Sequence, residues 1–425
     1  MTRKLADDCF ISDRPRLTHA DAIAILQARV TTVAEREDVA LIDANGRILA
    51  TPAMARVPVP NHTNAAVDGY CFAAAEYDRA TGSTFAITAR VAAGHALATA
   101  PQAKSAARIF TGAVMPAGHD TCAMQEDCTI GERDGIGTVT IPSGLKSGAN
   151  VRKAGEDVSA GTELMRAGDI VRPQDLAALA SIGMARVPVY RRLKVGMLSS
   201  GDEVVRPGVP LDHGQVYDAN MPMLTGLIAS AGALPVDLGV APDKPEALHA
   251  ILRDAARTCD VLLTSGGASK GEEDHMVTAL ETLGKRHLWQ LAIKPGRPMS
   301  FGQIGDCVTL GLPGNPVAVF VCFLLYAWPL LRRMGGAPWF EPVRYTLPAA
   351  FAFTGRKPGR REYWRGMLAE HDGRLAVDKF RRDGSGLISG LRAADGLIEI
   401  AEAHGDVHVG DPVTFIPFSA YGIVR

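Results

Sequence analysis

The sequence carries no marked excess of charge of either sign. Its 425 residues include 45 lysines and arginines against 46 aspartates and glutamates, a formal net charge of -1. Proteins that bind nucleic acid or an anionic membrane through a broad surface depend on a strong positive excess. We therefore expect neither partner. Any anion that the protein binds must be held by a local cluster of cations.

Cysteine pairs, a secretion signal and long apolar runs are also missing. The seven cysteines include no Cys-x-x-Cys pair, which argues against a disulfide framework and against a zinc site. Residues 1–16 lack the apolar core of a secretion signal, so we expect a cytoplasmic protein. The longest apolar stretch, Val317 to Leu331, is shorter than the roughly 18 residues of a membrane span and predicts a buried helix. Zincin and α/β-hydrolase mechanisms are disfavoured, because the sequence has no HExxH or GxSxG motif.

Apolar residues make up 47% of the chain, enough for several cores, and this length predicts two to four domains. Changes in the hydrophobic pattern predict an α/β multidomain protein of four units. These are a helical and extended unit at 1–56 and 150–189, an inserted β unit at 57–149, a doubly wound α/β unit at 190–337 and a C-terminal β-barrel-like unit at 338–425.

Local signals predict three helices in the first unit. Thr18 and Asp21 form a capping-box pattern before a helix that ends at Arg29. A second helical stretch is predicted around Ile42 to Ala50, and a third from Pro173 to Gly183. We expect the third helix to pack with the first.

Three loops of the α/β unit carry most of the functional information: 264–275, 294–298 and 312–316. Each follows an apolar run that reads as a buried strand, and in a parallel sheet all three emerge at the same carboxyl edge. They supply backbone N–H groups, cations and carboxylates, a combination suited to a phosphate-bearing substrate and a divalent metal. Glu203, after the first strand of the unit, reaches the same edge as Asp274. The two carboxylates are suited either to holding Mg²⁺ or to being neutralised by other partners.

Each of these features also has an ordinary structural interpretation. Gly266-Gly267 is also typical of a tight turn, and Asp274 and Asn315 are well placed as helix N-caps. Lys294 and Arg297 are equally compatible with a solvated connection. Together, the three loops favour binding of an oxyanion.

The motifs follow one another in an order that is similar to the molybdopterin molybdenumtransferase family, the MoeA-type enzymes related to the E domain of gephyrin. The resemblance covers nearly the whole chain, which makes it far more specific than any single glycine loop. The segments that carry it are Asn64 to Tyr70, Arg108 to Ala113, Gly155 to Asp157, Ser200 to Glu203, Ser265 to Ser269, Ile293 to Pro298 and Gly311 to Pro316.

The resemblance implies that molybdate and adenylylated molybdopterin react, with the help of Mg²⁺, to give molybdenum cofactor and AMP. It also implies a homodimer whose site joins the α/β unit of one subunit to the Asp68 and Asp157 regions of the other. The adenylyltransferase and molybdoenzyme maturation proteins are further expected partners. The residues implied as catalytic are Asp68, Asp157, Glu203, Asp274 and Lys294, with Glu203 and Asp274 as metal ligands. The residues implied in substrate binding are Thr111, Ser265, Gly266, Gly267, Ser269, Arg297, Pro313, Asn315, Pro316, Arg360, Ser385 and Ser389.

Two positions depart from the family pattern, because Arg297 and Gln290 stand where similar enzymes often have lysine. Arg297 keeps the charge and offers a planar fork to an oxyanion, whereas Gln290 removes a charge. Two alternatives remain open: a molybdopterin adenylyltransferase, which resembles the α/β unit alone, and a non-catalytic gephyrin-like scaffold. The choice between Ser385 and Ser389, and between molybdate and tungstate, is also open.

Overall fold

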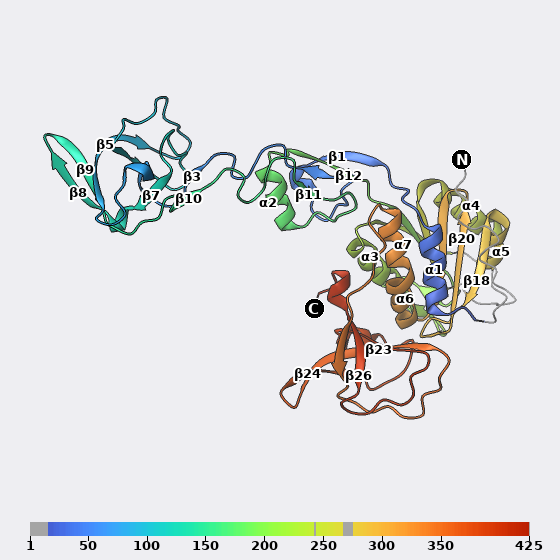
Figure 1. Cartoon of the computed structure of the whole chain (residues 1–425). Helices are drawn as coiled ribbons and strands as arrows, with labels where there is room; N and C mark the ends of the chain where they lie inside the picture. Colours follow the sequence, from blue (N-terminus) through green and yellow to red (C-terminus); the bar gives the residue numbers. More distant parts are fainter. Residues whose placement is uncertain (1–15, 242–243, 267–274, 425) are drawn as a thin grey trace.

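The computed structural model describes residues 16–241, 244–266 and 275–424, and the molecule is elongated (Figure 1). A small β unit and the α/β unit lie at opposite ends, joined by a slender unit that contains α2 (Pro173–Ser181). The C-terminal β unit lies beside the α/β unit. The multidomain α/β architecture is confirmed, while the exact boundaries of the four units stay predictions.

The α/β unit is built on a six-stranded sheet with the order β16-β13-β17-β21-β20-β18. Its strands are β13 (Lys194–Ser199), β16 (Leu234–Val240), β17 (Val261–Ser265), β18 (Lys285–Gln290), β20 (Pro298–Ile304) and β21 (Cys307–Leu312). Alternate residues of one strand enter different cores: Val261 and Leu263 lie in one cluster and Leu262 in the other. Both faces of the sheet are therefore covered, as a doubly wound fold requires.

The sheet is not parallel throughout. Strand β20, which the apolar runs of the sequence do not predict, runs antiparallel to both β21 and β18. Two reversals cancel, so β18 runs parallel to β21, and the loop after β18 still emerges at the carboxyl edge of β17 and β21. The three predicted loops therefore leave the same edge of the sheet.

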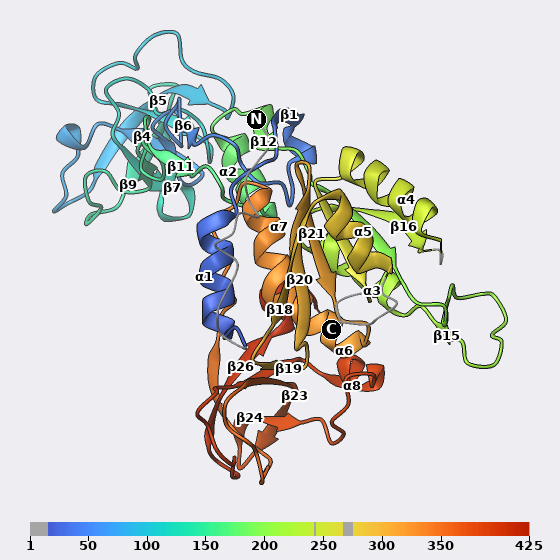
Figure 2. The ribbon, with the colours of Figure 1, turned by 90° about the vertical axis from the view of Figure 1, so that its right-hand side faces the viewer.

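Helices cover the two faces of this sheet. Figure 2 shows α1 (His19–Arg29) and α7 (Trp328–Met334) on one side, and α4 (Pro245–Thr258) and α5 (His275–Leu283) on the other. The α3 helix (Asn220–Ser230) and α6 (Pro316–Cys322) pack into the same cluster as α1 and α7. A π-helical turn, η5 (Phe323–Ala327), links α6 to α7.

The continuous helical run Pro316–Met334 is long and apolar enough to span a membrane by length and composition alone. However, 94% of its most apolar window is buried inside the protein. It is the core helix that the sequence predicts.

Helix α1 begins as predicted, because the Thr18 Oγ1 accepts a hydrogen bond of 3.1 Å from the Asp21 amide. Its packing differs from the prediction. Ala22, Leu26 and Val30 are buried in the cluster of the α/β unit, whereas α2 packs in a separate cluster with Leu49 and Val189.

The helix predicted around Ile42 to Ala50 does not form beyond the short 3-10 turn η2 (Leu41–Asp43). Gly46 has a φ of +72°, a left-handed conformation that turns the chain. The rest of this slender unit consists of short pairs: β1 (Arg36–Ala40) with β12 (Arg186–Tyr190), β2 (Ala53–Met54) with β11 (Glu163–Met165), and β3 (Asn64–Ala65) with β10 (Val151–Arg152).

The inserted β unit is a second six-stranded sheet with its own two cores. Its strands are β4 (Gly69–Phe72), β5 (Ser83–Val91), β6 (Ser105–Ile109), β7 (Thr121–Met124), β8 (Thr129–Arg133) and β9 (Ile136–Ile141), with the 3-10 turns η3 (Ala74–Glu76) and η4 (Gln125–Asp127). A small pair, β14 (Val204–Val205) with β15 (Val216–Tyr217), extends from the α/β unit.

One strand of the α/β unit pairs into the sheet of the C-terminal unit. Its sheet has the order β19-β23-β25-β26-β22, and β24 pairs with β23. The strand from the α/β unit, β19 (Ile293–Lys294), lies in the predicted oxyanion loop. The other elements are β22 (Tyr345–Pro348), β23 (Arg361–His371), β24 (Arg374–Lys379), α8 (Ile388–Ala393), β25 (Gly396–Ile400), β26 (Pro412–Pro417) and η6 (Phe418–Tyr421).

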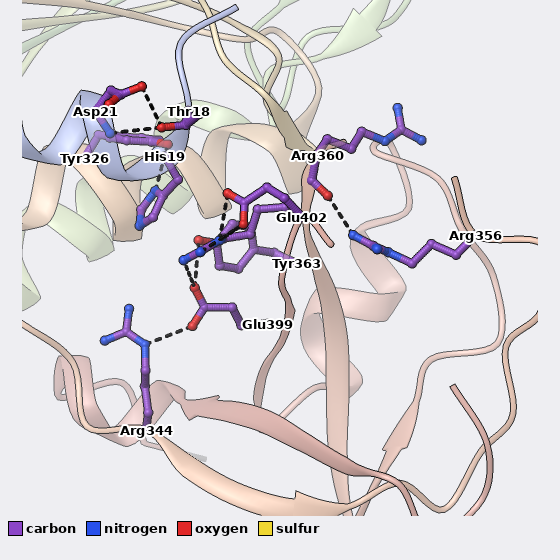
Figure 3. Close-up of polar contacts among 11 residues, drawn as sticks. Thr18, His19, Asp21, Tyr326, Arg344, Arg356, Arg360, Tyr363, Glu399 and Glu402 are labelled. Carbon is purple, nitrogen blue, oxygen red and sulfur yellow. Dashed lines mark hydrogen bonds and ion pairs between the residues drawn. The ribbon is translucent and has the colours of Figure 1, made fainter. Parts of the chain in front are cut away.

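A buried polar network joins α1, the π-helical turn and the C-terminal sheet (Figure 3). The His19 Nδ1 lies 3.0 Å from the Tyr326 hydroxyl, and the His19 ring meets the Tyr363 ring edge-on. Burial lowers the pKa of His19 from 6.5 to about 4, and the positive charge of Arg361 contributes to the same shift. Arg361 is in turn paired with Glu399 at 3.0 Å.

Because its folded-state pKa is depressed, His19 is neutral at pH 7 and stabilises the fold less as the pH falls from 6.5 towards 4. The difference between the unfolded and folded pKa of His19 corresponds to about 3 kcal/mol of folding free energy, at roughly 1.4 kcal/mol per pKa unit. This stabilisation is fully present above pH 6.5. We predict that the stability difference between wild type and His19→Gln in urea unfolding shrinks by up to this amount between pH 7 and pH 4. A difference that is independent of pH would contradict the prediction.

Candidate active site

Two adjacent hollows lie over the carboxyl edge of the α/β sheet. The larger, of about 1240 Å³, is bounded by the ends of β13, β15 and α3. The smaller, of about 510 Å³, lies between the loops 294–298 and 313–318 and the C-terminal unit. Gly266, Gly314 and Asn315 line both. The two hollows therefore adjoin one another, and together they form a cleft large enough for an extended ligand.

Gly266 allows two loops to approach each other closely at the centre of this cleft. Its φ is +93°, and a β-carbon there would lie 2.7 Å from the Ser200 hydroxyl oxygen. Its amide is not free for a ligand, contrary to expectation, because it donates to the Leu312 carbonyl at 3.2 Å. Gly267, Ser269 and Asp274 lie outside the described residues.

Asn220, the first residue of α3, ties two of the loops together. Its amide nitrogen donates to the Ser265 hydroxyl and to the Gly314 carbonyl, both at 2.7 Å. Its amide oxygen is buried and has no hydrogen-bond partner in the described part of the chain. A buried acceptor without a partner is costly, so Asn220 is a candidate to receive a donor from a ligand in the larger hollow.

Asp218, just before Asn220, is buried and supports the wall of the larger hollow. It accepts hydrogen bonds from the Ser199 hydroxyl at 2.6 Å and from the Met221 amide at 3.0 Å. The residues from Tyr217 to Asn220 predict the start of a helix, but they do not predict the contacts of Asn220 with distant loops.

Glu203 and Asn315 both face the cleft as predicted. Glu203 is exposed, and its carboxylate folds over Gly201, where a β-carbon would lie 2.6 Å from Oε2. Asn315 stands at the N-cap position of α6, but its side chain makes no capping hydrogen bond. Within residues 16–241, 244–266 and 275–424, no three His, Cys, Asp or Glu side chains gather as a metal site.

Lys294, one of the two predicted cations of the oxyanion loop, meets cations of the C-terminal unit around one buried carboxylate, Glu362. Pairing of β19 with β23 places Lys294 opposite Glu362. The Glu362 carboxylate lies 3.5 Å from Lys294 Nζ and 3.3 Å from Arg360 Nε. It also accepts a hydrogen bond of 2.9 Å from the Trp364 indole and lies 3.9 Å from Arg356. Sequence reasoning missed Glu362, since a glutamate on a strand is normally taken as solvent-facing.

A third hollow of about 130 Å³ brings Lys294, Arg297 and Arg360 together. Arg297 is exposed there. The cations expected to bind an oxyanion therefore converge, although their roles remain predictions.

The two candidate serines differ in position. Ser385 lines the 510 Å³ hollow, and its carbonyl accepts a hydrogen bond of 2.9 Å from the Val317 amide at the start of α6. Ser389 is exposed on α8 and lines none of the three hollows. Pro313 lines the 510 Å³ hollow and Pro316 the 1240 Å³ hollow.

Asp68 and Thr111 lie in the inserted β unit, at the other end of the molecule from this cleft (Figure 1). Asp68 accepts hydrogen bonds from the Thr111 amide at 2.7 Å and from the Thr111 hydroxyl at 2.8 Å. These bonds hold the pKa of the Asp68 carboxyl below its usual value. Asp157 is exposed in the slender unit. One chain thus does not bring these carboxylates to Lys294.

Comparison with known families gives matches along three successive parts of the chain. They are the MoeA N-terminal region (domain I and II) at residues 17–183, a probable molybdopterin binding domain at 196–333 and the MoeA C-terminal region (domain IV) at 346–418. A molybdopterin molybdenumtransferase of Haemophilus influenzae is 35% identical over 89% of this chain and 93% of its own length. This chain belongs to the molybdopterin molybdenumtransferase family.

Another member of the family and a solved structure agree with this membership. The molybdopterin molybdenumtransferase 2 of Mycobacterium tuberculosis is 32% identical over 88% of this chain and 92% of its own length. The crystal structure of a molybdopterin biosynthesis moeA protein from Pyrococcus horikoshii matches with a TM-score of 0.79 and 26% identity, over 95% of this chain and the whole of that one. The transferase architecture therefore extends over all the units described above.

Replacing Glu362 by glutamine should destabilise this transferase. The neutral amide can still accept from the Trp364 indole, but the fully buried Arg356 side chain loses its counter-charge. Breaking a buried pair in this way costs about 3 kcal/mol. The matched control is Glu163→Gln. The Glu163 carboxylate is 45% exposed, against 3% for Glu362, and its partner Arg166 is 83% exposed, so this variant should cost below about 1 kcal/mol. Urea unfolding measures both, and an equal loss in the two variants would refute the role given to Glu362.

Proposed function

We propose that this chain inserts molybdate into adenylylated molybdopterin, releases AMP and so yields molybdenum cofactor. The observation that carries the proposal is the convergence of Lys294, Arg297 and Arg360 on one hollow beside a larger cleft. The cations suit a small oxyanion, and the cleft suits a long nucleotide-linked substrate. A reaction between the two requires such neighbouring sites.

Within the cleft, we assign the substrate phosphates to the loops of Gly266 and Asn315. Because Gly266 has no β-carbon, a phosphate can approach its backbone closely. The Gly266 amide itself is already hydrogen-bonded to the Leu312 carbonyl. The Asn315 side chain makes no capping hydrogen bond at the start of α6 and can therefore contact a ligand there. Asn220 would receive a donor from the bound molecule through its unpartnered amide oxygen.

Mg²⁺ fits the larger hollow, because it binds through one or two carboxylates and keeps its other positions for water and phosphate. Glu203 supplies one exposed carboxylate there. Asp274 is the predicted second ligand. Bound Mg²⁺ would neutralise charge on the pyrophosphate of the substrate.

We propose a homodimer in which Asp68 and Asp157 of a second copy complete the site. The support is their separation from the cleft within one chain (Figure 1). Hydrogen bonds from Thr111 lower the pKa of Asp68 and fix the orientation of its carboxylate, which suits a group presented to another subunit. The cytoplasmic location, and the adenylyltransferase and molybdoenzyme maturation proteins as partners, stay predictions.

The two alternatives are less favoured. An adenylyltransferase would resemble the α/β unit alone, yet the family matches include residues 17–183 and 346–418 as well. A scaffold would not need the clustered cations of the cleft.

Purified protein incubated with adenylylated molybdopterin, Mg²⁺ and molybdate should release AMP only when molybdate is present. Lys294→Ala removes a charge-assisted contact and should lower kcat/KM for molybdate about 10- to 100-fold. Lys194→Ala, an exposed lysine at the opposite edge of the sheet, is the matched control and should have no effect. AMP release without molybdate, or binding without turnover, would contradict the proposed function.

A further inference from the structure

The chain just before α1 lies against the predicted oxyanion loop. The Leu17 amide donates to the Gln290 carbonyl at 2.9 Å, and the Leu17 carbonyl accepts from the Ala292 amide at 2.8 Å. Leu17 itself is buried, at 7% exposure. These contacts fix the backbone of the neighbouring Arg16 beside the strand that leads into Lys294.

The other side of the same strand is occupied by the C-terminal unit. The Arg361 amide donates to the Ala292 carbonyl at 2.8 Å, and Lys294 pairs with Glu362. Three segments distant in sequence, 16–17, 290–294 and 360–362, thus run together. Each contributes cations to the hollow of about 130 Å³, whose charged lining residues are Arg16, Lys294, Arg297 and Arg360.

The charges around this hollow are not balanced. Lys294 and Arg360 share the single carboxylate of Glu362. Arg16 and Arg297 have no ion-pair partner in the part of the chain that the structure describes, and no carboxylate lines the hollow. Cations held close together in this way repel one another, and an anion between them relieves the repulsion.

We propose that Arg16 is a binding residue for the oxyanion substrate, the fourth cation around a doubly charged tetrahedral anion of the molybdate class. This inference rests on the proposed function and adds a residue to its site. The hollow is about ten times the 10–15 Å³ that one water needs, so it has room for a small oxyanion. Arg16 and Arg297 are both guanidinium groups, which can grip two oxygens of such an anion at once.

The position of Arg16 also explains how the N-terminal segment takes part in the site. Thr18 caps α1, and both the amide and the carbonyl of Leu17 are hydrogen-bonded to the strand at 290–292. Arg16 immediately precedes these two fixed residues. The same hydrogen bonds that dock α1 on the α/β unit therefore bring a cation to the hollow. The capping pattern at Thr18 is visible in the sequence, but the contact with Gln290 and Ala292 is not.

Arg16→Gln should raise the KM for molybdate on the order of 10-fold, because one charge-assisted contact is lost, while kcat changes by less than about twofold. Arg16→Lys should restore part of the affinity, since it keeps the charge but not the fork. Arg192→Gln, an exposed arginine at the opposite edge of the sheet, is the control and should leave KM unchanged. Calorimetric titration of the protein with molybdate alone provides a second readout that does not depend on turnover.

The outcomes separate this inference from the proposed function. If wild type releases AMP only with molybdate, and Arg16→Gln keeps both the wild-type KM and the wild-type affinity, the role of Arg16 is wrong and the function stands. If wild type releases no AMP, but Arg16→Gln binds molybdate more weakly, the function is wrong and the role of Arg16 stands. If wild type does not bind molybdate, or if Arg192→Gln weakens binding as much as Arg16→Gln, the inference is overturned.

Discussion

The site depends on one buried carboxylate that is shared between two units of the molecule. Glu362 belongs to the C-terminal sheet, but it lies opposite Lys294 of the α/β unit and within ion-pair distance of Arg356 and Arg360. Removing a carboxylate from water is expensive unless cations and donors surround it. Glu362 therefore gathers cations from both units. Because it is one charge among several positive ones, it orients them without neutralising them, and the hollow beside it keeps a positive potential.

The backbone supports the same arrangement. Residues 290–294 are bonded to the N-terminal segment on one side and to β23 on the other, and they then enter β20 of the large sheet. A loop held on both sides loses little further entropy when it grips an anion. At the far end of the molecule, Asp68 is held in a comparable way by Thr111. Both parts of the proposed site are thus held in place within one chain, as a site completed by a second copy of the chain would need.

The sequence was a good guide where the signal was local. The cap at Thr18, the core helix after Pro316 and the strands at β13, β17 and β21 were predictable from capping chemistry and apolar runs. The sequence does not predict strand β20, because Ser300, Gly302 and Gln303 interrupt its apolar pattern, although all three are buried. The helix predicted near Gly46 failed because a left-handed glycine and tertiary hydrogen bonds outweigh weak helical propensity there.

The less predictable features of the site depend on contacts between distant segments. Burial of Glu362, the bonds of Asn220 to two loops and the difference between Ser385 and Ser389 cannot be read from the neighbouring residues alone. The convergence of the three loops was predictable, since strand direction determines it, and the extra reversal through β20 preserves it. Family resemblance named the candidate motifs, and the packing shows which of their polar groups already have hydrogen-bond partners, such as the Gly266 amide.

The most direct test is to locate an oxyanion by anomalous diffraction from tungsten in crystals soaked with tungstate, which matches molybdate in charge and shape. A tungsten peak in the hollow bounded by Lys294, Arg297 and Arg360 is the predicted result. The account would be contradicted if the hollow stayed empty while tungsten occupied another basic surface, such as the cleft lined by Arg192 and Lys194.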